Sequence, residues 1–533
     1  MSNPLTNLTP EKRLLLQKRL QQKGGGLASQ GDDTIPPREP ALSEVEGAVT
    51  PPPLSVNQEG LWFLHQLAPD EPNFNVPGTV RVTGRLNLPA LQQSLDTIFA
   101  RHEILRTTFR TGPDGTPAQI IHPPAARPLI RIDLTALPAG AREPEAIRQI
   151  LARGYAPFDL SRGPLFLPIL FTLSETEFVF SILVHHIICD GWSMGVFQKE
   201  LMALYSAFST GLPAALPDLP IQYADYAVWE RLPRHAEDRL KRLAYWRGQL
   251  GGHSPLINLP LDHPRPSVQS YRGRHTLIQI DGDLSSALRS RARAEGVTLY
   301  MLLLTAFKMF IHAITGQDDL TIGAGIANRD RSELEALIGF FVRVLPLRTS
   351  LSGNPAFRQL LAQVRETVLE ANTHHLPLAY LVKELSPPRD PSRPPFFQIE
   401  FTLLTPDKNP ALFAPIVTGV EESIRLHDLT LSAVPVEGGI ARFDLAIFLW
   451  DMPAGLTGAV EYCADLFEEA TIAKLISQFK SVLQFIHDQP ETRLNEVARL
   501  IQDAEAQVQG QQRQLAQAAV REKFSIIKRK PRG

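Results

Sequence analysis

Cysteine is almost missing from this chain of 533 residues, which contains only Cys189 and Cys463. Two cysteines form neither the disulfide framework of a small secreted protein nor a cysteine-rich metal site, so we expect a reducing compartment, the cytoplasm. Long apolar runs are missing as well, since none reaches the roughly 20 residues that span a bilayer. The N-terminal residues are polar and charged, without the apolar stretch of a signal peptide. These absences predict that the chain does not enter a membrane.

An excess of either charge is also missing. Lys and Arg number 54 and Asp and Glu 56, which gives a net charge of −2. No overall field would attract nucleic acid or an anionic membrane, and we expect neither as a partner. Hydrophobic residues make up 44% and charged residues 21%, as in ordinary globular proteins. The length exceeds what one core supports, so two or more compact units are expected.

Composition and periodicity divide the chain into four parts. Residues 1–53 predict a flexible segment with a short amphipathic helix at 10–22 and a linker rich in Pro and Gly. Patterns of strand and helix then alternate in similar order through 54–230 and 231–500, which predicts an α/β fold of two related lobes. Residues 501–533 contain good helix formers and end in a basic cluster, which predicts a helical tail.

One apolar run, "FVFSILVHHIICDGWSMGVF" at 178–197, is interrupted by two adjacent histidines and then by Asp190 and Gly191. Neighbouring side chains of a strand point to opposite faces, so His185 and His186 cannot easily share one metal ion or one task. Both faces of the strand are apolar, which predicts that it is covered on both sides.

Two interpretations of this histidine pair are open from the residues alone. Both could be core histidines that backbone groups satisfy, or one could face a cavity at the strand end, where an imidazole suits proton transfer near neutral pH. The pair followed by Asp-Gly favours the second interpretation. Asp190 could orient a histidine or could pair with an arginine and hold the turn.

"HHIICDGWS" resembles the HHxxxDG signature of condensation domains of nonribosomal peptide synthetases, a superfamily that includes chloramphenicol acetyltransferase. Six further segments resemble other motifs of that family in the same order: "LSVNQEGLWFLHQL" (54–67), "RHEILRTTF" (101–109), "YADYAVW" (223–229), "IGFFVRVLPLR" (338–348), "HHLPLAYLV" (374–382) and "RDPSRPPFFQ" (389–398). The resemblance covers about 54–500. The chain departs from the usual motifs at Asn57, where Ala is common, and at Arg343, where Asn is common. The segment 374–382 is a degraded form of its motif.

The resemblance implies a fold of two chloramphenicol-acetyltransferase-like lobes that form a V-shaped pseudo-dimer with a central tunnel. Donor and acceptor carrier proteins of the synthetase would dock at opposite ends of the tunnel. Their phosphopantetheine arms would bring an acyl or peptidyl thioester and an amine, which the domain joins as an amide. The chain itself would bind no cofactor and no metal. We expect a free-standing domain, because the sequence carries no adenylation or carrier segment, so other chains would supply the substrates.

The resemblance also implies roles for the residues of the signature. His186 would lie at the tunnel centre, either as a general base or as a positioning group, while His185 and Asp190 would support it. In relatives the Asp pairs with an arginine, for which Arg329 is the first candidate here and Arg106 the second.

Four further residues have two interpretations each. Gly191 would keep the turn open and could present its backbone N–H to the reacting carbonyl. Trp192 and Ser193 would border the substrate channel, or simply pack. Arg343 would select a polar or anionic acceptor if it lies near the tunnel, or would occupy a surface position of a strand.

Several other functions remain alternatives. An epimerisation domain shares HHxxxDG, although the segments 54–67 and 101–109 fit condensation better. A cyclisation domain would carry aspartate in place of the histidine pair. An ester-forming or coenzyme A-dependent acyltransferase would use the same fold. A non-catalytic platform that recruits carriers usually has a damaged signature, and here the signature is intact.

Overall fold

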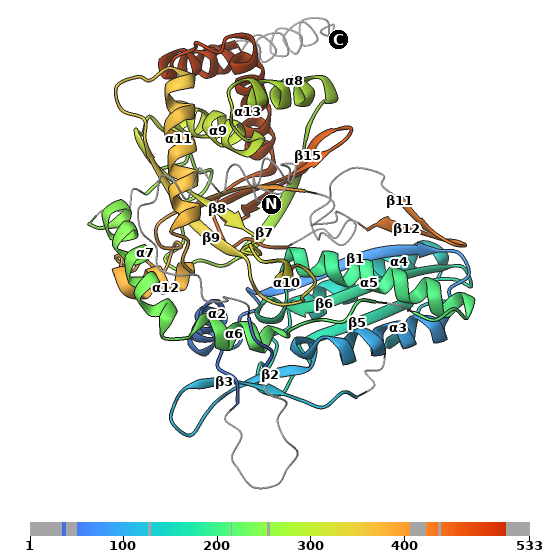
Figure 1. Ribbon diagram of the computed structural model, residues 1–533. Helices are drawn as coiled ribbons and strands as arrows, with labels where there is room; N and C mark the ends of the chain where they lie inside the picture. The colour runs from blue at the N-terminus through green and yellow to red at the C-terminus, as the bar shows by residue number, and fades with distance from the viewer. Residues whose placement is uncertain are drawn as a thin grey trace, which may run out of the picture.

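The computed structural model describes residues 35–38, 51–125, 129–214, 216–252, 256–405, 423–434 and 439–507. The helix expected at 10–22 and the basic end of the expected tail lie outside these residues. Strands and helices alternate through both halves of the chain and form two lobes, each built on one main sheet (Figure 1). This arrangement confirms the α/β prediction.

The first lobe contains a six-stranded sheet in the spatial order β11-β12-β1-β6-β5-β4. Its strands are β1 (Asn75–Thr83), β4 (Ile130–Asp133), β5 (Phe166–Thr172), β6 (Glu177–His185), β11 (Ser423–Leu426) and β12 (Leu429–Ala433). Only β4 and β5 run parallel. Three long helices accompany the sheet: α3 (Leu88–Arg101), α4 (Ala139–Gly154) and α5 (Gly191–Thr210).

Strand β6, which leads to the histidine pair, is covered on both faces. Phe180 and Ile182 belong to the core cluster that contains α3 and α5, whereas Val179 and Leu183 belong to the cluster that contains α4. The alternation of side chains along a strand produces this division. The prediction of a strand covered on both sides is therefore confirmed.

The second lobe contains a seven-stranded sheet in the order β13-β7-β15-β14-β10-β8-β9. Its strands are β7 (Arg272–Ile280), β8 (Asp319–Ile326), β9 (Arg343–Ser350), β10 (Ile399–Leu404), β13 (Gly439–Ile440), β14 (Leu445–Met452) and β15 (Gly455–Cys463). The helices that pack on it are α8 (Gly282–Ala294), α9 (Leu299–Thr315), α11 (Phe357–Thr373) and α13 (Glu469–Asp488). The side chains that face them are apolar, and the alternate side chains face the first lobe.

The shorter elements complete the framework. They are α2 (Val56–Leu67), η1 (Glu103–Arg106), β2 (Thr107–Thr111), β3 (Pro117–Ile121), η2 (His186–Ile188), α6 (Tyr223–Glu230), α7 (Arg234–Leu250), α10 (Ser332–Glu335) and α12 (Leu378–Leu385). Helix α2 begins with a capping box between Ser55 and Gln58. It approaches α12 so closely that a Cβ at Gly60 would lie 2.3 Å from the Cβ of Ala379. A glycine in the first motif therefore permits this contact between the two halves of the chain.

The lobes are not two contiguous stretches of sequence. Strand β12 from the second half pairs with β1 of the first sheet, from Val80 opposite Ala433 to Thr83 opposite Thr430. Residues 334–341 likewise contribute to the core that contains α3 and α5. Two segments from beyond the expected division at residue 230 thus belong to the first lobe. Only contacts between residues far apart in the sequence specify their place.

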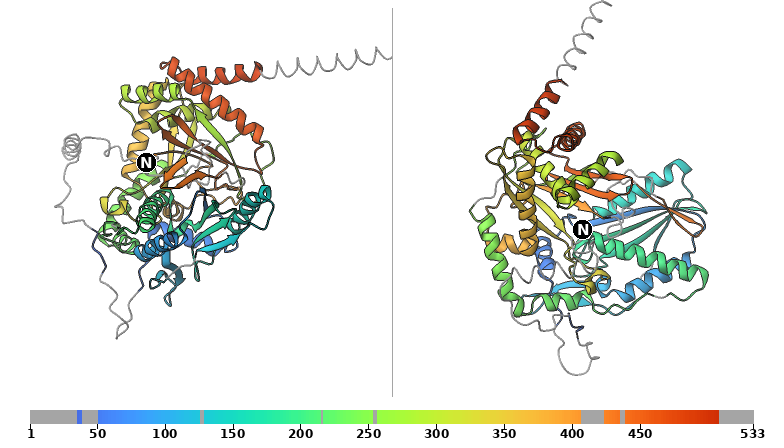
Figure 2. Two further views of the ribbon diagram at one scale, coloured as in Figure 1. Left: turned by 90° about the vertical axis from the view of Figure 1, so that its right-hand side faces the viewer. Right: turned by 45° about the horizontal axis from the view of Figure 1, so that its top comes forward.

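The C-terminal part of the described chain is more firmly attached than the sequence suggested. Residues 494–507 are helical, and Leu494, Val497 and Ile501 are buried in the core of the second lobe. Glu505 forms an ion pair of 2.6 Å with Lys474 of α13. Figure 2 shows this helix, in red, lying across the end of the second lobe. The folded body therefore extends beyond the expected limit near residue 500.

In the described part of the chain no single helix is long and apolar enough to cross a bilayer. Helices α8 and α9 pass that test only as a pair, with a bend of 106° between them, and residues 301–311 of α9 are buried in the core. The same residues contain no group of three His, Cys, Asp or Glu side chains placed to hold a metal ion.

Candidate functional site

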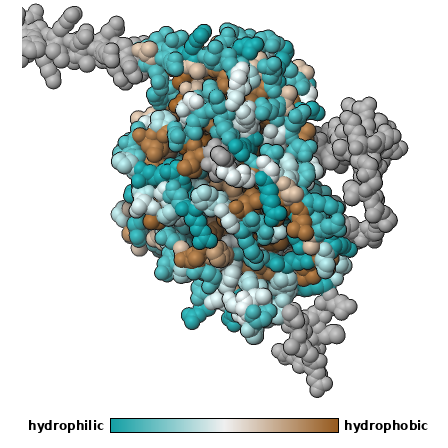
Figure 3. Space-filling model, turned by 90° about the vertical axis from the view of Figure 1, so that its left-hand side faces the viewer, coloured by the Kyte–Doolittle hydropathy of each residue, from teal (hydrophilic) through white to brown (hydrophobic). Residues whose placement is uncertain are grey.

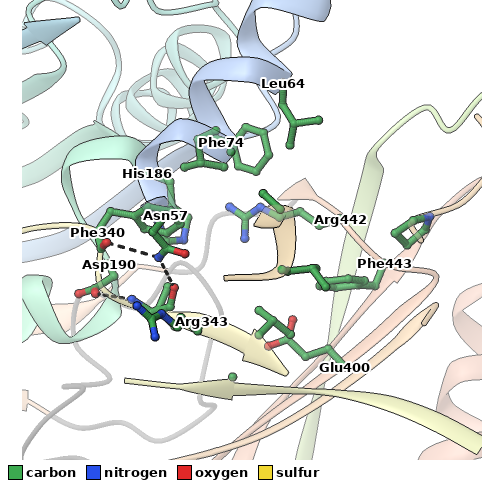
Figure 4. A pocket seen from close by; sticks show the side chains of 18 of the residues that line it. Asn57, Leu64, Phe74, His186, Asp190, Phe340, Arg343, Glu400, Arg442 and Phe443 are labelled. Atoms are coloured by element: carbon green, nitrogen blue, oxygen red, sulfur yellow. Dashed lines mark hydrogen bonds between the residues drawn. The ribbon is translucent and has the colours of Figure 1, made fainter. Parts of the chain in front are cut away.

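A cavity of about 1990 Å³ lies between the two sheets and is lined by both lobes. His186 comes from the first lobe, and Glu400 and Arg442 come from the second (Figure 4). Trp192 also lines the cavity from the first lobe. The exposed apolar residue Leu64 of α2 also lines it, so the cavity reaches the surface beside that helix. Figure 3 shows apolar side chains in patches on the face that carries α7 and α12. The cavity is large enough for two substrates to meet.

His186 lies on the cavity wall where β6 ends. Its backbone N–H donates to the carbonyl oxygen of Phe74 at 2.7 Å, and its ring lies edge-on to Phe340 with centroids 5.0 Å apart. Its Nδ1 is buried and has no hydrogen-bond partner among the described residues. The imidazole is thus held by its backbone and by ring packing.

The surroundings of His186 keep its imidazole neutral. Burial, and then the positive charge of Arg442, lower the pKa of His186 to about 4, although Asp190 acts in the opposite direction. A neutral ring can accept or donate one hydrogen bond at physiological pH.

His185 has a different environment from its neighbour. Its side chain is buried, and its Nδ1 accepts a hydrogen bond from the backbone N–H of Ile187 at 3.1 Å. Its ring packs edge-on against Phe158 at 6.0 Å. Burial is the main cause that lowers the pKa of His185 well below its ordinary value. His185 does not line the cavity, as expected for a supporting residue.

Asp190 accepts hydrogen bonds from four neighbouring residues. Its Oδ1 caps α5 by accepting from the backbone N–H of Ser193 at 2.8 Å, and Arg329 donates to the same oxygen at 3.2 Å. Its Oδ2 accepts from the backbone N–H groups of Phe341 at 3.0 Å and Val342 at 3.1 Å. Burial opposes ionisation, but Arg329 and these hydrogen bonds outweigh it and hold the pKa of Asp190 below its usual value.

The arginine partner of Asp190 is Arg329, the first candidate. The Arg329 side chain is fully buried, donates to the carbonyl of Leu337 at 2.7 Å, and stacks 4.2 Å over the ring of Phe341. Arg106, the second candidate, donates instead to the carbonyl of His122. The prediction of Arg329 is confirmed, and that of Arg106 is wrong.

The residues after Asp190 separate into lining and supporting groups. Gly191 begins α5 and faces the cavity, where the first N–H groups of a helix have no acceptor within the helix. Trp192 lines the cavity and donates through Nε1 to the carbonyl of Glu335 at 2.9 Å. Ser193 is fully buried, and its hydroxyl accepts from the backbone N–H of Gly339 at 3.0 Å. Ser193 supports the wall and does not line it.

Arg343 is a buried cavity residue, so the interpretation as a surface position is wrong. Its Nη2 forms an ion pair with Glu230 at 2.6 Å, and its Nη1 donates to Nδ1 of His375. Burial, and then the positive charges of Arg343 and Arg242, keep the pKa of His375 well below its ordinary value, so this imidazole accepts. The charge of Arg343 is largely neutralised within the protein.

Several polar cavity residues were given no role by the sequence analysis. Asn57, a departure from the usual motif, donates to the carbonyl of Val342 at 2.6 Å and so braces the segment that Asp190 also binds. Glu400 and Glu461 project from strands, and Arg442 precedes β14. A single Glu inside the apolar run "FFQIEFTLL" was the signal that could have found Glu400.

Comparisons with known proteins agree with this geometry. The family model described as "Condensation domain" matches residues 50–509. The chain is 42% identical over 451 residues to chondramide synthase cmdD of Chondromyces crocatus, covering 84% of this chain and 11% of that protein. It is 41% identical over 439 residues to one polypeptide of the linear gramicidin synthase of Brevibacillus parabrevis, covering 82% and 6%. The chain thus spans a small fraction of these curated relatives.

Solved structures have the same fold. The X-domain from teicoplanin biosynthesis is 31% identical with a TM-score of 0.73, and the match covers 85% of this chain and 98% of that one. The same kind of X-domain is also solved in complex with OxyB, at 30% identity and a TM-score of 0.73, covering 88% and 99%. The first condensation domain of the calcium-dependent antibiotic synthetase, in complex with a substrate analogue, has a TM-score of 0.66 at 21% identity, covering 84% and 99%.

Proposed function

The chain belongs to the condensation-domain family of nonribosomal peptide synthetases, and on that basis we propose that it forms an amide bond between a donor thioester and an acceptor amine. Amide formation is the activity of the family. The observation that carries the proposal for this chain is the intact signature, with a neutral His186 on the wall of a cavity that both lobes line.

The proposed reaction balances without a co-reactant. The acceptor nitrogen attacks the thioester carbonyl, a C–N bond forms, the C–S bond breaks, and the proton of the amine leaves with the thiol. Transfer of a proton from an ammonium group of pKa about 8 to an imidazole of pKa about 4 would cost about 5 kcal/mol. His186 therefore acts mainly by accepting a hydrogen bond that positions the attacking amine.

The neighbouring residues support this step. Gly191 begins α5 and lines the cavity, where the partial positive end of the helix would favour the oxygen that becomes negative. Asp190 and Arg329 hold that helix end against the segment that follows α10. We propose no catalytic contact for His185, Asp190 or Arg329.

Carrier-bound phosphopantetheine arms would bring both substrates. The arms belong to partner carrier proteins, and the thioester and the amine are substrates rather than resident cofactors of this chain. The cavity reaches the surface beside α2, where Leu64 and Leu67 line it and are exposed. Such an apolar entry suits a long, flexible and partly apolar arm.

Intact-protein mass spectrometry tests the proposal. A donor carrier loaded with an acyl group and an acceptor carrier loaded with an amino acid are mixed with the domain. We expect the acyl mass to move to the acceptor carrier with the wild type and to stay on the donor with His186→Ala. Equal transfer by both would remove His186 from the reaction.

A non-catalytic platform is the second candidate, because of the likeness to an X-domain that is solved with OxyB. In that case the wild type would bind carriers and transfer no acyl group from any loaded pair. Co-purification of a bound partner enzyme, with no effect of His186→Ala on that binding, would favour the platform.

A further inference from the structure

A row of ionisable side chains crosses the face of the second sheet that looks into the cavity. The strand register pairs Glu400 with Ala446 and Ala446 with Glu461. The two glutamates therefore lie two strands apart on the same face, with only a methyl group between them. His275 of β7 pairs with Glu461 and continues the row. Glu400, Glu461 and His275 all line the cavity.

The carboxylate of Glu400 lies close to the backbone of Gly325. A Cβ at Gly325 would lie 3.3 Å from Oε1 of Glu400 and 3.1 Å from Oγ1 of Thr402. Because glycine has no Cβ, Glu400 and Thr402 fit against this strand, where a larger residue would crowd them. The hydroxyl of Thr402 donates to the same Oε1 at 3.0 Å and so orients the carboxylate. Because Glu400 lines the cavity, a ligand group there can reach this carboxylate.

Within the described part of the chain, neither glutamate has a counter-ion of its own. Across the described ranges of the chain, no Lys, Arg or His nitrogen forms an ion pair within 4.0 Å of Glu400 or Glu461. Arg442, the cation that influences both, donates to the carbonyl of Asn73 at 3.2 Å and lies 5.7 Å over the ring of Phe74. Glu400 is only 7% exposed, and a buried carboxylate without a counter-ion is costly.

The pKa shifts of the two carboxyls agree with the missing counter-ion. Burial raises the pKa of Glu400, and Arg442 only partly offsets it. Burial is also the main cause that raises the pKa of Glu461 to about 7. The cavity thus shifts both carboxyls toward the protonated form, and a cation that entered would shift them toward the ionised form.

We propose that Glu400, with Glu461 beside it, forms a subsite for a positively charged side chain, an ammonium or guanidinium group, on one of the two aminoacyl substrates. This inference rests on the proposed function. The substrate would supply the missing counter-ion through charge-assisted hydrogen bonds, which are strong in a site shielded from water. Phe448 and Trp450 follow Ala446 on the same face of β14 and line the cavity, so they can pack on the stem of such a side chain.

Substrate pairs that differ only in side-chain charge test the subsite. Lysine and norleucine are compared first as acceptors and then as donors, each on the same thioester or amine mimic. We expect kcat/KM of the wild type to favour lysine about tenfold or more in one of the two positions, and Glu400→Gln to remove that preference by lowering the lysine value alone. The position that shows the preference identifies the substrate. Both members carry an α-amino group, so that group cannot produce the difference.

A binding measurement separates this inference from the proposed function. Pentylamine and pentanol are titrated into the protein by calorimetry, with the wild type, Glu400→Gln and the control Glu177→Gln, which removes an exposed carboxylate of β6. We expect the amine to bind the wild type and the control and to bind Glu400→Gln at least about tenfold more weakly. Binding of this kind without any acyl transfer would keep the subsite and refute the proposed function. Transfer with no charge preference in either position, and no effect of Glu400→Gln on amine binding, would refute the subsite alone.

Discussion

Asp190 and Arg329 form a buried ion pair, with Oδ1 and Nη2 3.2 Å apart, although 139 positions separate them in the sequence. The pair joins the start of α5 to the segment that follows β8. Asp190 also accepts two backbone N–H groups from residues 341 and 342. The wall that carries the catalytic candidate is therefore assembled from both halves of the chain by one carboxylate.

Removal of the Asp190 carboxylate should lower the stability of the protein much more than removal of the His186 imidazole. Asp190→Ala leaves the guanidinium of Arg329 buried without its partner, so we expect a loss of about 3–5 kcal/mol in the free energy of unfolding. His186→Ala removes a side chain that packs mainly on Phe340 and should lose at most about 1 kcal/mol. Urea unfolding measures both. A loss in His186→Ala as large as in Asp190→Ala would make His186 structural.

The pH dependence of transfer should reflect a neutral His186. Its pKa of about 4 means that the imidazole gains a proton only as the pH falls toward 4. An alkoxyamine is a weak base, so as an acceptor it stays neutral between roughly pH 5.5 and 8. With this acceptor we expect the transfer rate to be nearly constant over that range. Arg442→Met removes a positive charge near the ring and should raise the pKa of His186, measured by NMR of the imidazole. An inflection near pH 6.5 in the wild type that His186→Ala abolishes would contradict this prediction.

Arg343 should contribute both stability and selectivity. Arg343→Asn leaves the carboxylate of Glu230 buried without its ion-pair partner, so we expect a loss of about 3 kcal/mol or more. The double change Arg343→Met with Glu230→Gln should recover part of that loss, because no charge is left unpaired. Arg343 also lines the cavity. In Arg343→Asn, we therefore expect the product ratio from competing acceptors of different charge to change more than the product ratio from competing donors. An unchanged product ratio would leave Arg343 with a structural role only.

Buried Lys308 should give the protein a characteristic stability profile. Its ammonium donates to the carbonyl of Leu347 at 2.7 Å and to the hydroxyl of Thr349 at 2.9 Å, and burial lowers the pKa of Lys308 from 10.5 to about 7. Between these values the unfolded state binds more protons than the folded state, so this group makes stability rise with pH, by roughly 5 kcal/mol in total. Below pH 7 it contributes no slope, because both states are protonated. We expect the difference in unfolding free energy between wild type and Lys308→Met to change between pH 7 and pH 10, and a constant difference would contradict the shift.

The C-terminal residues beyond the described chain carry a separate prediction. A basic cluster, Lys528, Arg529, Lys530 and Arg532, ends the sequence, and carriers are typically acidic. A deletion should begin at residue 508, because Glu505 binds Lys474. We expect this deletion to leave the reaction of small thioesters unchanged and to raise the apparent KM for one partner protein, with an effect that fades as salt rises. If neither the KM nor its salt dependence changes, docking lies on the lobes.

The sequence by itself determined the local features of this protein. Apolar residues on alternate positions of β6 specified a strand covered on both faces, and its period placed His185 and His186 in different surroundings. The Asp-Gly that follows specified the start of α5, because Asp190 caps it. Seven motifs in order were enough to predict the family and the α/β fold. Each of these features depends on a few consecutive residues.

Only the tertiary structure decided which distant residues meet. It selected Arg329 rather than Arg106 as the partner of Asp190, placed Arg343 in the cavity wall rather than on the surface, and added β12 to the first sheet. It also placed Glu400 and Glu461 side by side, since strands β10, β14 and β15 are neighbours in space with a particular register. Sequence periodicity tells which face of a strand a residue occupies, but the sheet order and register that bring two faces together arise from the packing of the whole chain.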